Sequence, residues 1–484
     1  MTISNSTKPL DSHFSRIIYI FTFAILGFGI PPSSLTAESQ QPDVVFIIVD
    51  DLNDWLGCLG GHPDASSPNI DALAASGMLF SQAYCNSPQC RPSRTSLNHG
   101  IYPFNTGTYF NAKSKDEKKI TTPTMQQVFG ANGYRVASGG KVFHGGPGSS
   151  GDALLKRPSD PRPPKGKDTF GKLNPPNDGY ALDVKDEAMG DYKVAQWAVG
   201  EWYTETEKPL FMSVGFFRPH RPLQVPKTYF DQFPVDSIHR PEEPKKDDWN
   251  DMPDFAKRLA RTHAHKALHS GLSDHEYMVA NDQWDVTIQA YHASIAFVDK
   301  QIGHFLKALE KNPRGRETVV MLVSDHGWHL GEKKHWCKGA IWEQTTHIPF
   351  MVRANGVKPG SVCTKPVSLI DVFPTLIDLA GIDRPTYLDG NSISPQLKDP
   401  KTKRSPVISS YGEGNTAIRT ERWRYIRYED GSEELYDHKV DKNEWTNQAS
   451  NPKHAELKKR LADMIPKDQH TGLKVQDWYD KFQK

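Results

Sequence analysis

The amino-acid sequence predicts an α/β sandwich built around a large, mostly parallel central sheet flanked by helices, with a small antiparallel-sheet subdomain at the C-terminus. Apolar runs typical of strands buried on both faces alternate with helical segments along most of the chain. The composition changes after about Leu397, where short strands separated by turn residues begin. These observations predict an α/β domain over residues 38–397 and a C-terminal α+β subdomain over residues 398–484.

The first predicted strand is Asp43 to Val49, an unbroken apolar and β-branched run. A helix follows it, because Ser67 is a good N-cap, Pro68 suits the first helical position and Gly77 ends the segment. The remaining core elements alternate between helix and strand. They are the helix Met125 to Asn132, the strand Tyr134 to Ser138, the helix Tyr192 to Thr206, the strand Leu210 to Phe217, the helix Val286 to Leu309 and the strand Thr318 to Val323.

Short strands and one helix are predicted in the C-terminal subdomain. The strands are Val407 to Tyr411, Thr416 to Tyr428 and Glu434 to Val440. A charged helix follows near His454 to Met464. Two polar, proline-rich stretches, Lys156 to Asp178 and Pro234 to Asp274, are predicted to be long surface excursions over the α/β core.

The N-terminus is typical of an exported protein. Lys8 and Arg16 precede a short apolar stretch, Ile17 to Ile30, which is followed by small residues. We therefore expect residues 1–37 to be a signal peptide cleaved after Ala37, and a mature protein that is periplasmic or secreted. An uncleaved membrane anchor is the alternative, but a comfortable membrane span needs about 20 apolar residues. Stable membrane insertion is therefore not expected.

Charge and cysteine content narrow the functional classes. The 484 residues include 59 basic and 58 acidic side chains, so the formal charge of +1 gives no reason to expect nucleic acid as a partner. Five cysteines are too few for a scaffold built on disulfides. They are Cys58, Cys85, Cys90, Cys337 and Cys363. An odd number in an exported chain leaves at least one cysteine without an intramolecular partner, and the sequence does not fix any pairing.

Four predicted core strands run directly into polar clusters. These clusters are Asp50-Asp51, Gly140 to His144, Arg218 to Arg221 and Ser324 to Gly327. Because ligands of open α/β sheets bind at the carboxyl ends of the strands, we expect the four clusters to meet there. Asp50, Asp51 and Asp325 would then form a carboxylate site suited to one Ca²⁺ ion, with His326 as a further ligand or just behind the ligands. The simpler alternative for Asp50-Asp51 is a helix cap.

A cysteine beside two arginines is the second chemical feature. Cys90-Arg91-Pro92-Ser93-Arg94 places a thiol near positive charge and a likely helix start, which would lower its pKa and attract an anion. From these residues alone, Cys90 is the nucleophile of a cysteine hydrolase, a redox thiol or a disulfide partner of Cys85.

The motif Cys-x-Pro-Ser-Arg, with Gly100 ten residues after Cys90, resembles the signature of the type I, formylglycine-dependent sulfatases of the alkaline phosphatase superfamily. Other motifs of that family occur in the same order. They are Asp50-Asp51, Gly140-Lys141-Val142-Phe143-His144, Arg218-Pro219-His220, Ser324-Asp325-His326-Gly327, Trp336 with Lys338, and Glu434-Leu435-Tyr436-Asp437. The resemblance extends from Asp43 to the C-terminus and is greatest to the iduronate-2-sulfatase branch.

The resemblance implies an alkaline-phosphatase-like fold and a set of residue roles. A formylglycine-generating enzyme would oxidise Cys90 to formylglycine, whose hydrate is the nucleophile. Ca²⁺ would be held by Asp50, Asp51, modified Cys90, Asp325 and His326. The sulfate would be surrounded by Arg94, Lys141, His144, His220 and Lys338. His220, helped by Lys338, would protonate the departing alcohol, and His144 would accept the proton whose removal releases sulfate.

The resemblance suggests a 2-sulfated uronic acid, in a glycosaminoglycan or an algal polysaccharide such as ulvan. Arg221, Lys334 and His335, with Lys333, flank the site motifs and are candidate sugar-binding residues, although such a charge run is usually a solvated face. Arg91 stands where the family often has a small residue. The two surface excursions would set the depth of the pocket.

Three other functional classes remain as alternatives. A phosphate or phosphonate monoester hydrolase of the same superfamily would share the metal site, and a non-catalytic relative would only bind sulfated glycans. A redox protein would need a second thiol, such as Cys85. Taken singly, His144 and His220 also suit core positions, and Lys338 a solvated surface. Phe216, Phe217 and Trp328 are expected to be packing residues.

Overall fold

The computed structural model describes residues 40–113, 115, 117–163, 179–261, 272–311 and 314–477. Contacts divide the chain into Met1–Gln40 and Gln41–Lys484, and the fold belongs to the second unit. The predicted signal peptide, residues 1–37, lies outside the described residues, as does most of the predicted excursion Lys156 to Asp178. Among the helices that are described, none has the length and apolar character needed to cross a membrane.

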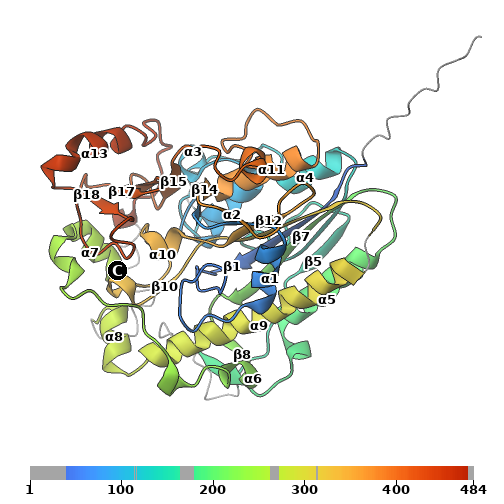
Figure 1. Ribbon diagram of the computed structural model, residues 1–484, viewed down its shortest axis with the longest axis horizontal. Helices are drawn as coiled ribbons and strands as arrows, with labels where there is room; N and C mark the ends of the chain where they lie inside the picture. The colour runs from blue at the N-terminus through green and yellow to red at the C-terminus, as the bar shows by residue number, and fades with distance from the viewer. Residues whose placement is uncertain are drawn as a thin grey trace, which may run out of the picture. The chain divides into compact units, whose positions relative to one another are not determined.

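An eight-stranded sheet forms the centre of this unit (Figure 1). Its strands follow the order β13-β2-β12-β9-β1-β7-β4-β5. Its strands are β1 (Asp43–Asp50), β2 (Met78–Phe80), β4 (Arg135–Gly140), β5 (Ala153–Lys156), β7 (Leu210–Pro219), β9 (Thr318–Ser324), β12 (Phe350–Arg353) and β13 (Ser361–Cys363). Neighbouring strands are parallel except at β12, which is antiparallel to both β9 and β2. The predicted large, mostly parallel sheet is confirmed.

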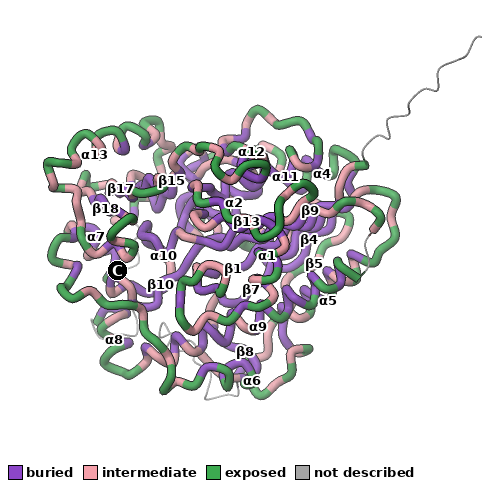
Figure 2. Tube along the Cα trace, viewed as in Figure 1, coloured by how far each residue is buried: buried purple, intermediate pink, exposed green. Residues whose placement is uncertain are grey.

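Both faces of the sheet are buried, as the unbroken apolar run of β1 predicts. Val45, Ile47 and Val49 belong to one hydrophobic cluster, which also contains residues of the long helix α9 (Trp284–Lys311). The alternate residues of β1 belong to a second cluster on the other face. Because successive side chains of a strand point to opposite faces, only apolar residues suit a strand covered on both sides. Figure 2 shows this buried centre beneath the more exposed helices.

Helices cover the two faces of the sheet. One face carries α1 (Pro68–Ser76), α5 (Gly190–Tyr203) and α9, and the other carries α2 (Cys90–His99), α4 (Met125–Ala131) and α11 (Val372–Leu379) (Figure 1). The predicted helices therefore agree with α1, α4, α5 and α9 within a few residues. The remaining helices are α3 (Pro103–Thr106), α6 (Lys227–Phe230), α7 (Asp254–Ala260), α8 (Asp274–Ala280), α10 (Glu343–Thr346), α12 (Ser394–Lys398) and α13 (Ala455–Ala462).

A four-stranded antiparallel sheet follows near the C-terminus, in agreement with the predicted subdomain. Its strands are β15 (Val407–Ser410), β16 (Thr416–Arg419), β17 (Trp423–Arg427) and β18 (Glu433–Asp437). The prediction of a single strand from Thr416 to Tyr428 is wrong, because a turn at Thr420 to Arg422 divides this segment into β16 and β17. In that turn Thr420 Oγ1 accepts a hydrogen bond from Trp423 N at 2.8 Å. The strand predicted to reach Val440 ends at Asp437, and Val440 is exposed.

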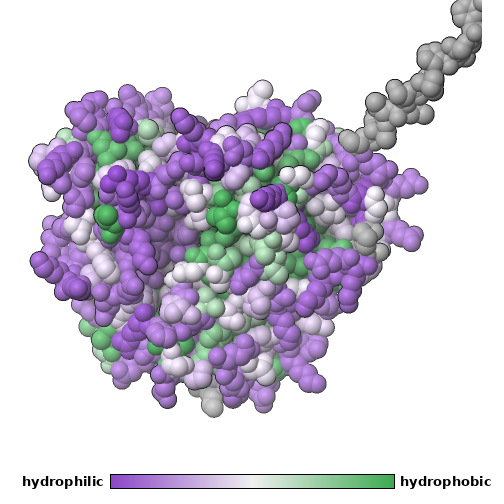
Figure 3. All heavy atoms as spheres, in the orientation of Figure 1, coloured by the Kyte–Doolittle hydropathy of each residue, from purple (hydrophilic) through white to green (hydrophobic). Residues whose placement is uncertain are grey.

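The excursion at 234–261 connects this sheet with the rest of the fold. Its helix α7 contributes Phe255 and Leu259 to a hydrophobic cluster that also contains Tyr428, Tyr436 and Trp342. The excursion is therefore packed rather than a free surface loop over its described part. On the face in Figure 3, hydrophilic residues dominate and hydrophobic residues gather in smaller patches between them.

Among the described residues, six strands of two or three residues lie outside the two main sheets and form three pairs. They are β3 (Ala83–Tyr84) with β14 (Val367–Ser368), β6 (Tyr180–Leu182) with β8 (Gln224–Pro226), and β10 (His329–Leu330) with β11 (Trp336–Cys337). The hairpin β10–β11 follows the end of β9 closely and leads to Lys338. It therefore decides which side chains of residues 329–338 reach the carboxyl edge of the sheet.

Candidate active site

The carboxyl ends of four parallel strands converge, as the sequence predicts. β1 ends at Asp50 and is followed by Asp51, while β9 is followed by Asp325 and His326. All four side chains are fully buried. The lysine of the Gly140 to His144 cluster, Lys141, directly follows β4 and is also buried. A polar group buried in this way must find partners, so the contacts within the cluster decide its chemistry.

A sharp turn after β1 lets two neighbouring aspartates serve the same site. Asp51 has a φ of 59°, in the left-handed region that few non-glycine residues adopt. The hydroxyl of Tyr291 donates to the carbonyl oxygen of Asp51 at 2.7 Å and accepts from Asn53 N at 3.0 Å. Tyr291 on α9 therefore holds the turn from behind, a role that the sequence did not indicate.

Helix α2 brings Cys90 and Arg94 into this cluster. Ser93 Oγ donates to the carbonyl oxygen of Asp325 at 2.6 Å, and Arg94 Nε donates to Asp325 Oδ2 at 2.7 Å. Arg94 Nη2 also donates to Asp50 Oδ1 at 3.0 Å. The Ser-Arg pair of the motif thus joins α2 to the ends of β1 and β9. Arg94 is fully buried and its guanidinium contacts Asp50 and Asp325, so it positions these carboxylates.

The glycine of the motif ends this helix. Gly100 has a φ of 69°, and its N–H donates to the carbonyl oxygen of Ser96. A Cβ atom at Gly100 would lie 2.2 Å from Leu388 Cδ2. Glycine is therefore required both by the left-handed C-cap and by the close approach of the neighbouring chain.

Positive groups surround the sulfur of Cys90. Its Sγ atom lies 2.9 Å from Lys338 Nζ, 3.4 Å from His326 Nε2 and 3.8 Å from Lys141 Nζ. Burial raises the pKa of the Cys90 thiol, but the ammonium groups of Lys141 and Lys338 outweigh it and bring the pKa down to about 7. An anionic atom at this position is therefore stabilised.

Neighbouring positive groups offset the negative charges of Asp50 and Asp51 to different extents. Burial opposes ionisation of Asp50, but Lys141 and Arg94 hold its pKa well below the usual range. Burial raises the pKa of Asp51 to about 7, although Lys338 Nζ donates to its Oδ1 at 2.7 Å. Asp51 Oδ2 has no hydrogen-bond partner among the described residues. A buried carboxylate oxygen without a donor needs a cation, so this atom points to a metal site.

The donor set fits a divalent ion. Ligand atoms of Asp50, Asp51, Cys90, Asp325 and His326 all lie within 4.8 Å of one another. Three carboxylates are the hard oxygen donors that Ca²⁺ prefers, whereas a cysteine sulfur is a soft ligand that does not suit it. The site is therefore best matched to Ca²⁺ when an oxygen atom replaces the sulfur at position 90.

His220 and His144 lie at the outer side of the cluster. His220 Nε2 is 3.8 Å from Asp51 Oδ2, and its Nδ1 is hydrogen-bonded to the carbonyl oxygen of Arg221 at 2.5 Å. Burial and the charges of Lys141 and Lys338 hold the pKa of His220 well below its usual range. His144 is exposed, and partial desolvation with the charge of Lys141 lowers its pKa to about 4. Both imidazoles are therefore neutral near pH 7.

Phe217 forms an aromatic platform beside these cations, whereas Phe216 is a core residue. The ring of Phe217 lies 4.6 Å from the ring of His220, and Lys141 Nζ is 5.2 Å from its centroid. The guanidinium of Arg157 lies 3.7 Å from the same centroid. The sequence analysis missed Arg157, because it lies in an excursion without a motif. Phe216 packs in the hydrophobic core, as predicted.

Two of the three candidate sugar-binding residues lie away from Cys90. His335 is buried, with its Nδ1 3.0 Å from His329 Nδ1, so it is a core residue. Lys334 Nζ binds Asp247 Oδ2 at 2.7 Å near the surface. Arg221 lies closer to the cluster, because its Nη1 donates to Cys337 Sγ at 3.6 Å and Cys337 precedes Lys338. Lys333 is buried as well, 3.2 Å from Asp248 Oδ2.

All five cysteines are free thiols. A Cys85–Cys90 disulfide is therefore absent from the structure. Cys85 is fully buried, and burial raises the pKa of its thiol far above the usual value. A buried thiol of this kind is a poor redox partner, which weakens the redox alternative.

Comparisons with known proteins agree with this geometry. The sulfatase family model matches residues 42–382, and a model described as N-sulphoglucosamine sulphohydrolase, C-terminal, matches residues 331–471. A sulfatase of Formosa agariphila is 32% identical over 90% of this chain and 88% of its own. The iduronate 2-sulfatase of Homo sapiens is 30% identical over 71% of this chain and 70% of its own.

A third relative and one solved structure complete the comparison. The Delta 4,5-hexuronate-2-O-sulfatase of Bacteroides thetaiotaomicron is 27% identical over 92% of this chain and 94% of its own. The phosphonate monoester hydrolase of Agrobacterium radiobacter has the same fold, with a TM-score of 0.71, 22% identity, and coverage of 87% of this chain and 94% of that one. The buried carboxylates, the cysteine motif and the family match together show that the chain belongs to the sulfatase family and is a sulfuric ester hydrolase.

Proposed function

We propose that this sulfatase removes sulfate from a sulfated carbohydrate, with a formylglycine derived from Cys90 as nucleophile and one Ca²⁺ ion. The observation that carries the proposal is the enclosure of Cys90 Sγ by Lys338, Lys141 and the buried aspartates at the strand ends. A simple structural cysteine has no need of two lysines and three carboxylates. A nucleophile that attacks an anionic ester does need them, because the positive charges attract the ester and the carboxylates hold a metal ion.

The ion and the modified side chain would each supply one kind of chemistry. Ca²⁺, held by Asp50, Asp51, Asp325 and His326, would supply Lewis-acid activation, and formylglycine would supply a hydroxyl nucleophile in its hydrated form. A plain thiol cannot regenerate itself by expelling sulfate, whereas a hydrate can collapse to an aldehyde. Maturation would therefore require a formylglycine-generating enzyme as a partner.

The lysines stabilise charge on the transferring sulfate. Lys338 Nζ and Lys141 Nζ lie 2.9 and 3.8 Å from Cys90 Sγ, close enough to contact the oxygens of a sulfate bound there. Lysine ammonium groups act as compact charges, and fixed charges in a water-poor site cost little reorganisation. Arg94 does not contact the sulfate directly in this proposal. Its guanidinium forms ion pairs with Asp50 and Asp325 and holds these two carboxylates in position.

The histidines are placed to move protons. The Nδ1 atom of His220 is engaged by a backbone carbonyl, which assigns its proton to Nδ1 and leaves the Nε2 lone pair toward Asp51 and the reacting centre. Because Nε2 carries no proton in this tautomer, we propose that the bound anionic ester raises the pKa of His220 and that Nε2 takes up a proton from solvent. Nε2 then passes that proton to the departing alcohol, with Lys338 beside it. His144, at the exposed edge, would accept the proton from the nucleophile in the later step.

The relatives indicate the class of sugar. Iduronate 2-sulfatase and hexuronate-2-O-sulfatase are named for 2-sulfated uronic acids, and we propose a substrate of that kind in a glycosaminoglycan or an algal polysaccharide such as ulvan. Arg157 on Phe217 and Arg221 beside Cys337 provide positive charge near the outer histidines. Such cations suit the carboxylate of a uronic acid.

Mass spectrometry of the chymotryptic fragment Cys85–Leu97, from protein co-expressed with a maturing enzyme, tests the nucleophile. Conversion of Cys90 to formylglycine lowers the fragment mass by roughly 18 Da. Fragment ions must place the change at Cys90 and not at Cys85. An unmodified Cys90 in active protein would contradict the proposal.

Turnover of sulfated uronic acid oligosaccharides tests the reaction class. The expected result is release of inorganic sulfate, with much slower hydrolysis of aryl phosphates and phosphonate monoesters. Faster phosphonate hydrolysis would favour the alternative function. Binding of sulfated glycans without any turnover by fully converted protein would favour a non-catalytic relative.

We also propose that the chain is exported, because residues 1–37 have the pattern of a signal peptide. N-terminal sequencing of protein recovered from the periplasm or the medium should begin near Glu38. Recovery of the intact chain in the membrane fraction would favour an uncleaved anchor.

A further inference from the structure

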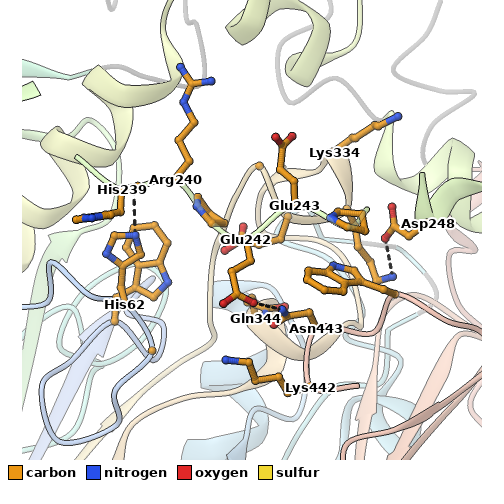
Figure 4. Close-up of a pocket in the computed structure, with 18 of the residues that line it drawn as sticks. His62, His239, Arg240, Glu242, Glu243, Asp248, Lys334, Gln344, Lys442 and Asn443 are labelled. Carbon is orange, nitrogen blue, oxygen red and sulfur yellow. Dashed lines mark hydrogen bonds and ion pairs between the residues drawn. The ribbon is translucent and has the colours of Figure 1, made fainter. Parts of the chain in front are cut away.

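A cavity of about 620 Å³ lies apart from the Cys90 cluster. The loop between β1 and α1 lines it together with the 239–248 part of the excursion, residues 331–334 of the hairpin and residues 442–445. In Figure 4, His62 and His239 lie together at one side of this cavity, and Asp248 and Lys334 lie at the opposite side. None of the residues assigned above to the metal or to proton transfer lines it.

A cluster of metal-ligating side chains stands at the histidine side of the cavity. His62 Nδ1 is 3.0 Å from His292 Nε2 on α9, and 3.9 Å from Asp64 Oδ2. One ligand atom from each of these three residues lies within 4.8 Å of the others. We propose that His62, Asp64 and His292 form a second metal site, which binds a borderline divalent ion of the Zn²⁺ class.

The spacing of the three ligand atoms suits such an ion. Zn–N and Zn–O bonds near 2.0–2.1 Å place neighbouring ligand atoms of a tetrahedral site about 3.4 Å apart. The separations of 3.0 and 3.9 Å bracket that value, so small side-chain movements are sufficient. Two imidazole nitrogens and one carboxylate oxygen favour Zn²⁺ over Ca²⁺, which prefers sites in which oxygen ligands predominate. Three protein ligands leave one position for water or for a group in the cavity.

The ring nitrogen of His62 that faces away from the cluster, Nε2, has the hydrogen-bond partner that is usual for a metal-bound histidine. The Nε2 atom lies 3.2 Å from the carbonyl oxygen of His239, a contact that only an Nε2–H group can make favourably. The lone pair of His62 is therefore at Nδ1, which faces His292 and Asp64. Metal-bound histidines usually donate their other ring N–H to a carbonyl or carboxylate in this way.

The carboxylate of Asp64 is also fixed from outside the cluster. His239 N donates to Asp64 Oδ2 at 2.9 Å, and His239 Nδ1 lies 2.7 Å from Asp64 Oδ1. These two contacts fix the orientation of the Asp64 carboxylate. His239 thus acts as a positioning residue for Asp64.

His292 is placed by ring stacking. Its side chain is 1% exposed and stacks on Trp55 and Phe233, with ring centroids 5.0 and 5.2 Å away. Its Nδ1 has no hydrogen-bond partner among the described residues, so Nε2 makes its polar contact. Asp64 N also approaches His62 Nδ1, at 3.2 Å. Two groups therefore converge on the single lone pair of that nitrogen, and a hydrogen bond between the two histidines satisfies His292 poorly.

An ion at this site would join three segments that are distant in sequence. His62 and Asp64 belong to the loop that begins with Asp51, His239 belongs to the excursion, and His292 belongs to α9. The ion would therefore stabilise the loop that carries the catalytic-site aspartates. The expected effect is on stability and metal content, independent of sulfate-ester turnover.

Metal analysis of the whole protein tests the proposal. Protein treated with a Zn²⁺-selective chelator and kept in excess Ca²⁺ is titrated with ZnCl₂, desalted and analysed for metal content. We expect one Zn²⁺ per chain, an increase in the melting temperature, and intense tetrahedral d–d absorption when Co²⁺ replaces Zn²⁺. Asp64→Asn and His292→Gln should each lose the bound ion and the melting shift.

Two control variants locate the ion. Asp325→Asn alters the Cys90 cluster and should keep the Zn²⁺, and His275→Gln alters another histidine that lines the cavity and should keep it too. Failure of the unmodified protein to retain Zn²⁺ in excess Ca²⁺ would overturn the proposal, even if a variant does not fold. Loss of Zn²⁺ in Asp325→Asn but not in Asp64→Asn would place the ion at the Cys90 cluster instead.

Discussion

Lys338 Nζ lies 2.9 Å from Cys90 Sγ and 2.7 Å from Asp51 Oδ1, so one ammonium group contacts both the proposed nucleophile position and a proposed metal ligand. Burial lowers the pKa of Lys338, but Asp51 and Cys90 outweigh it and raise the pKa above its usual value. Lys338 is therefore charged near neutral pH. It is a permanent part of the field at the reacting centre.

Replacing this lysine should reduce catalysis more than it reduces binding of the sugar. For Lys338→Met we expect kcat to fall by about 10²-fold or more, the usual effect of removing one charged donor from a transition state. The loss should be greater for sugar sulfates than for aryl sulfates, because an aryl oxide leaves without a proton donor. Steady-state kinetics with both substrates check this.

The matched control is Lys365→Met, which removes a surface lysine paired with Glu421 at 2.8 Å. Its kcat should be unchanged. Equal losses with sugar and aryl sulfates in Lys338→Met would mean that Lys338 stabilises sulfate charge without assisting the departing alcohol.

Removal of Ca²⁺ should abolish activity and lower the melting temperature. The free Oδ2 atom of buried Asp51, with a pKa raised to about 7, shows that this carboxylate lacks sufficient positive charge from the protein alone. Chelation followed by thermal melting with and without added Ca²⁺ measures the effect. In Asp51→Asn, Ca²⁺ should no longer raise the melting temperature, and a shift as large as in the unmodified protein would exclude Asp51 as a ligand.

A buried ion-pair network should make the protein sensitive to acid. Glu343 on α10 binds Arg424 Nη2 and lies 3.3 Å from Arg419 Nε, and its side chain contacts β16 and β17 of the C-terminal sheet. Burial opposes its ionisation, but Arg419, His438 and Arg424 hold its pKa well below the usual value. A depressed carboxyl pKa contributes stability that is complete above the unfolded-state pKa, near 4.3, and is lost as the pH falls below it.

Glu343→Gln should therefore destabilise the protein at pH 7 by about 3 kcal/mol or more, because it leaves buried arginines without a partner charge. The difference from the unmodified protein should shrink as the pH falls below about 4. Urea midpoints at pH 7 and at pH 3 measure this, because the contribution is lost only well below the unfolded-state pKa. Glu310→Gln, at a largely exposed ion pair with Arg353, should change neither midpoint. If Glu343→Gln lowered the stability equally at both pH values, the stabilisation would not depend on ionised Glu343.

Gly100→Ala should destabilise helix α2 of the active site. The left-handed φ of 69° and a Cβ position 2.2 Å from Leu388 Cδ2 together predict a loss of about 1–3 kcal/mol. Thermal melting measures it. Gly130→Ala is the matched control, because Gly130 lies in α4 and its added Cβ would meet its nearest neighbour at 3.5 Å. That variant should be neutral or slightly more stable.

Much of the core could be predicted because its signals are local. The strands β1, β4, β7 and β9 are apolar runs that end in polar clusters, and α1 is bounded by Pro68 and Gly77. Short strands such as β2 and β12 escaped prediction, because three or four residues form a strand only when a neighbouring strand supplies hydrogen bonds. The division between β16 and β17 depends likewise on one threonine turn.

The sequence by itself determined the chemistry of the site, because the motif residues follow parallel strands whose carboxyl ends must share one edge. Only the tertiary structure decided which charges face the nucleophile. In the hairpin that leads to Lys338, the positive φ values of Lys333, Lys334 and Cys337 interrupt the regular alternation of side chains. For that reason His335 and Lys333 turn into the core while Lys338 reaches Cys90. Contacts such as His62 with His292, 230 residues apart, depend on packing that no local pattern encodes.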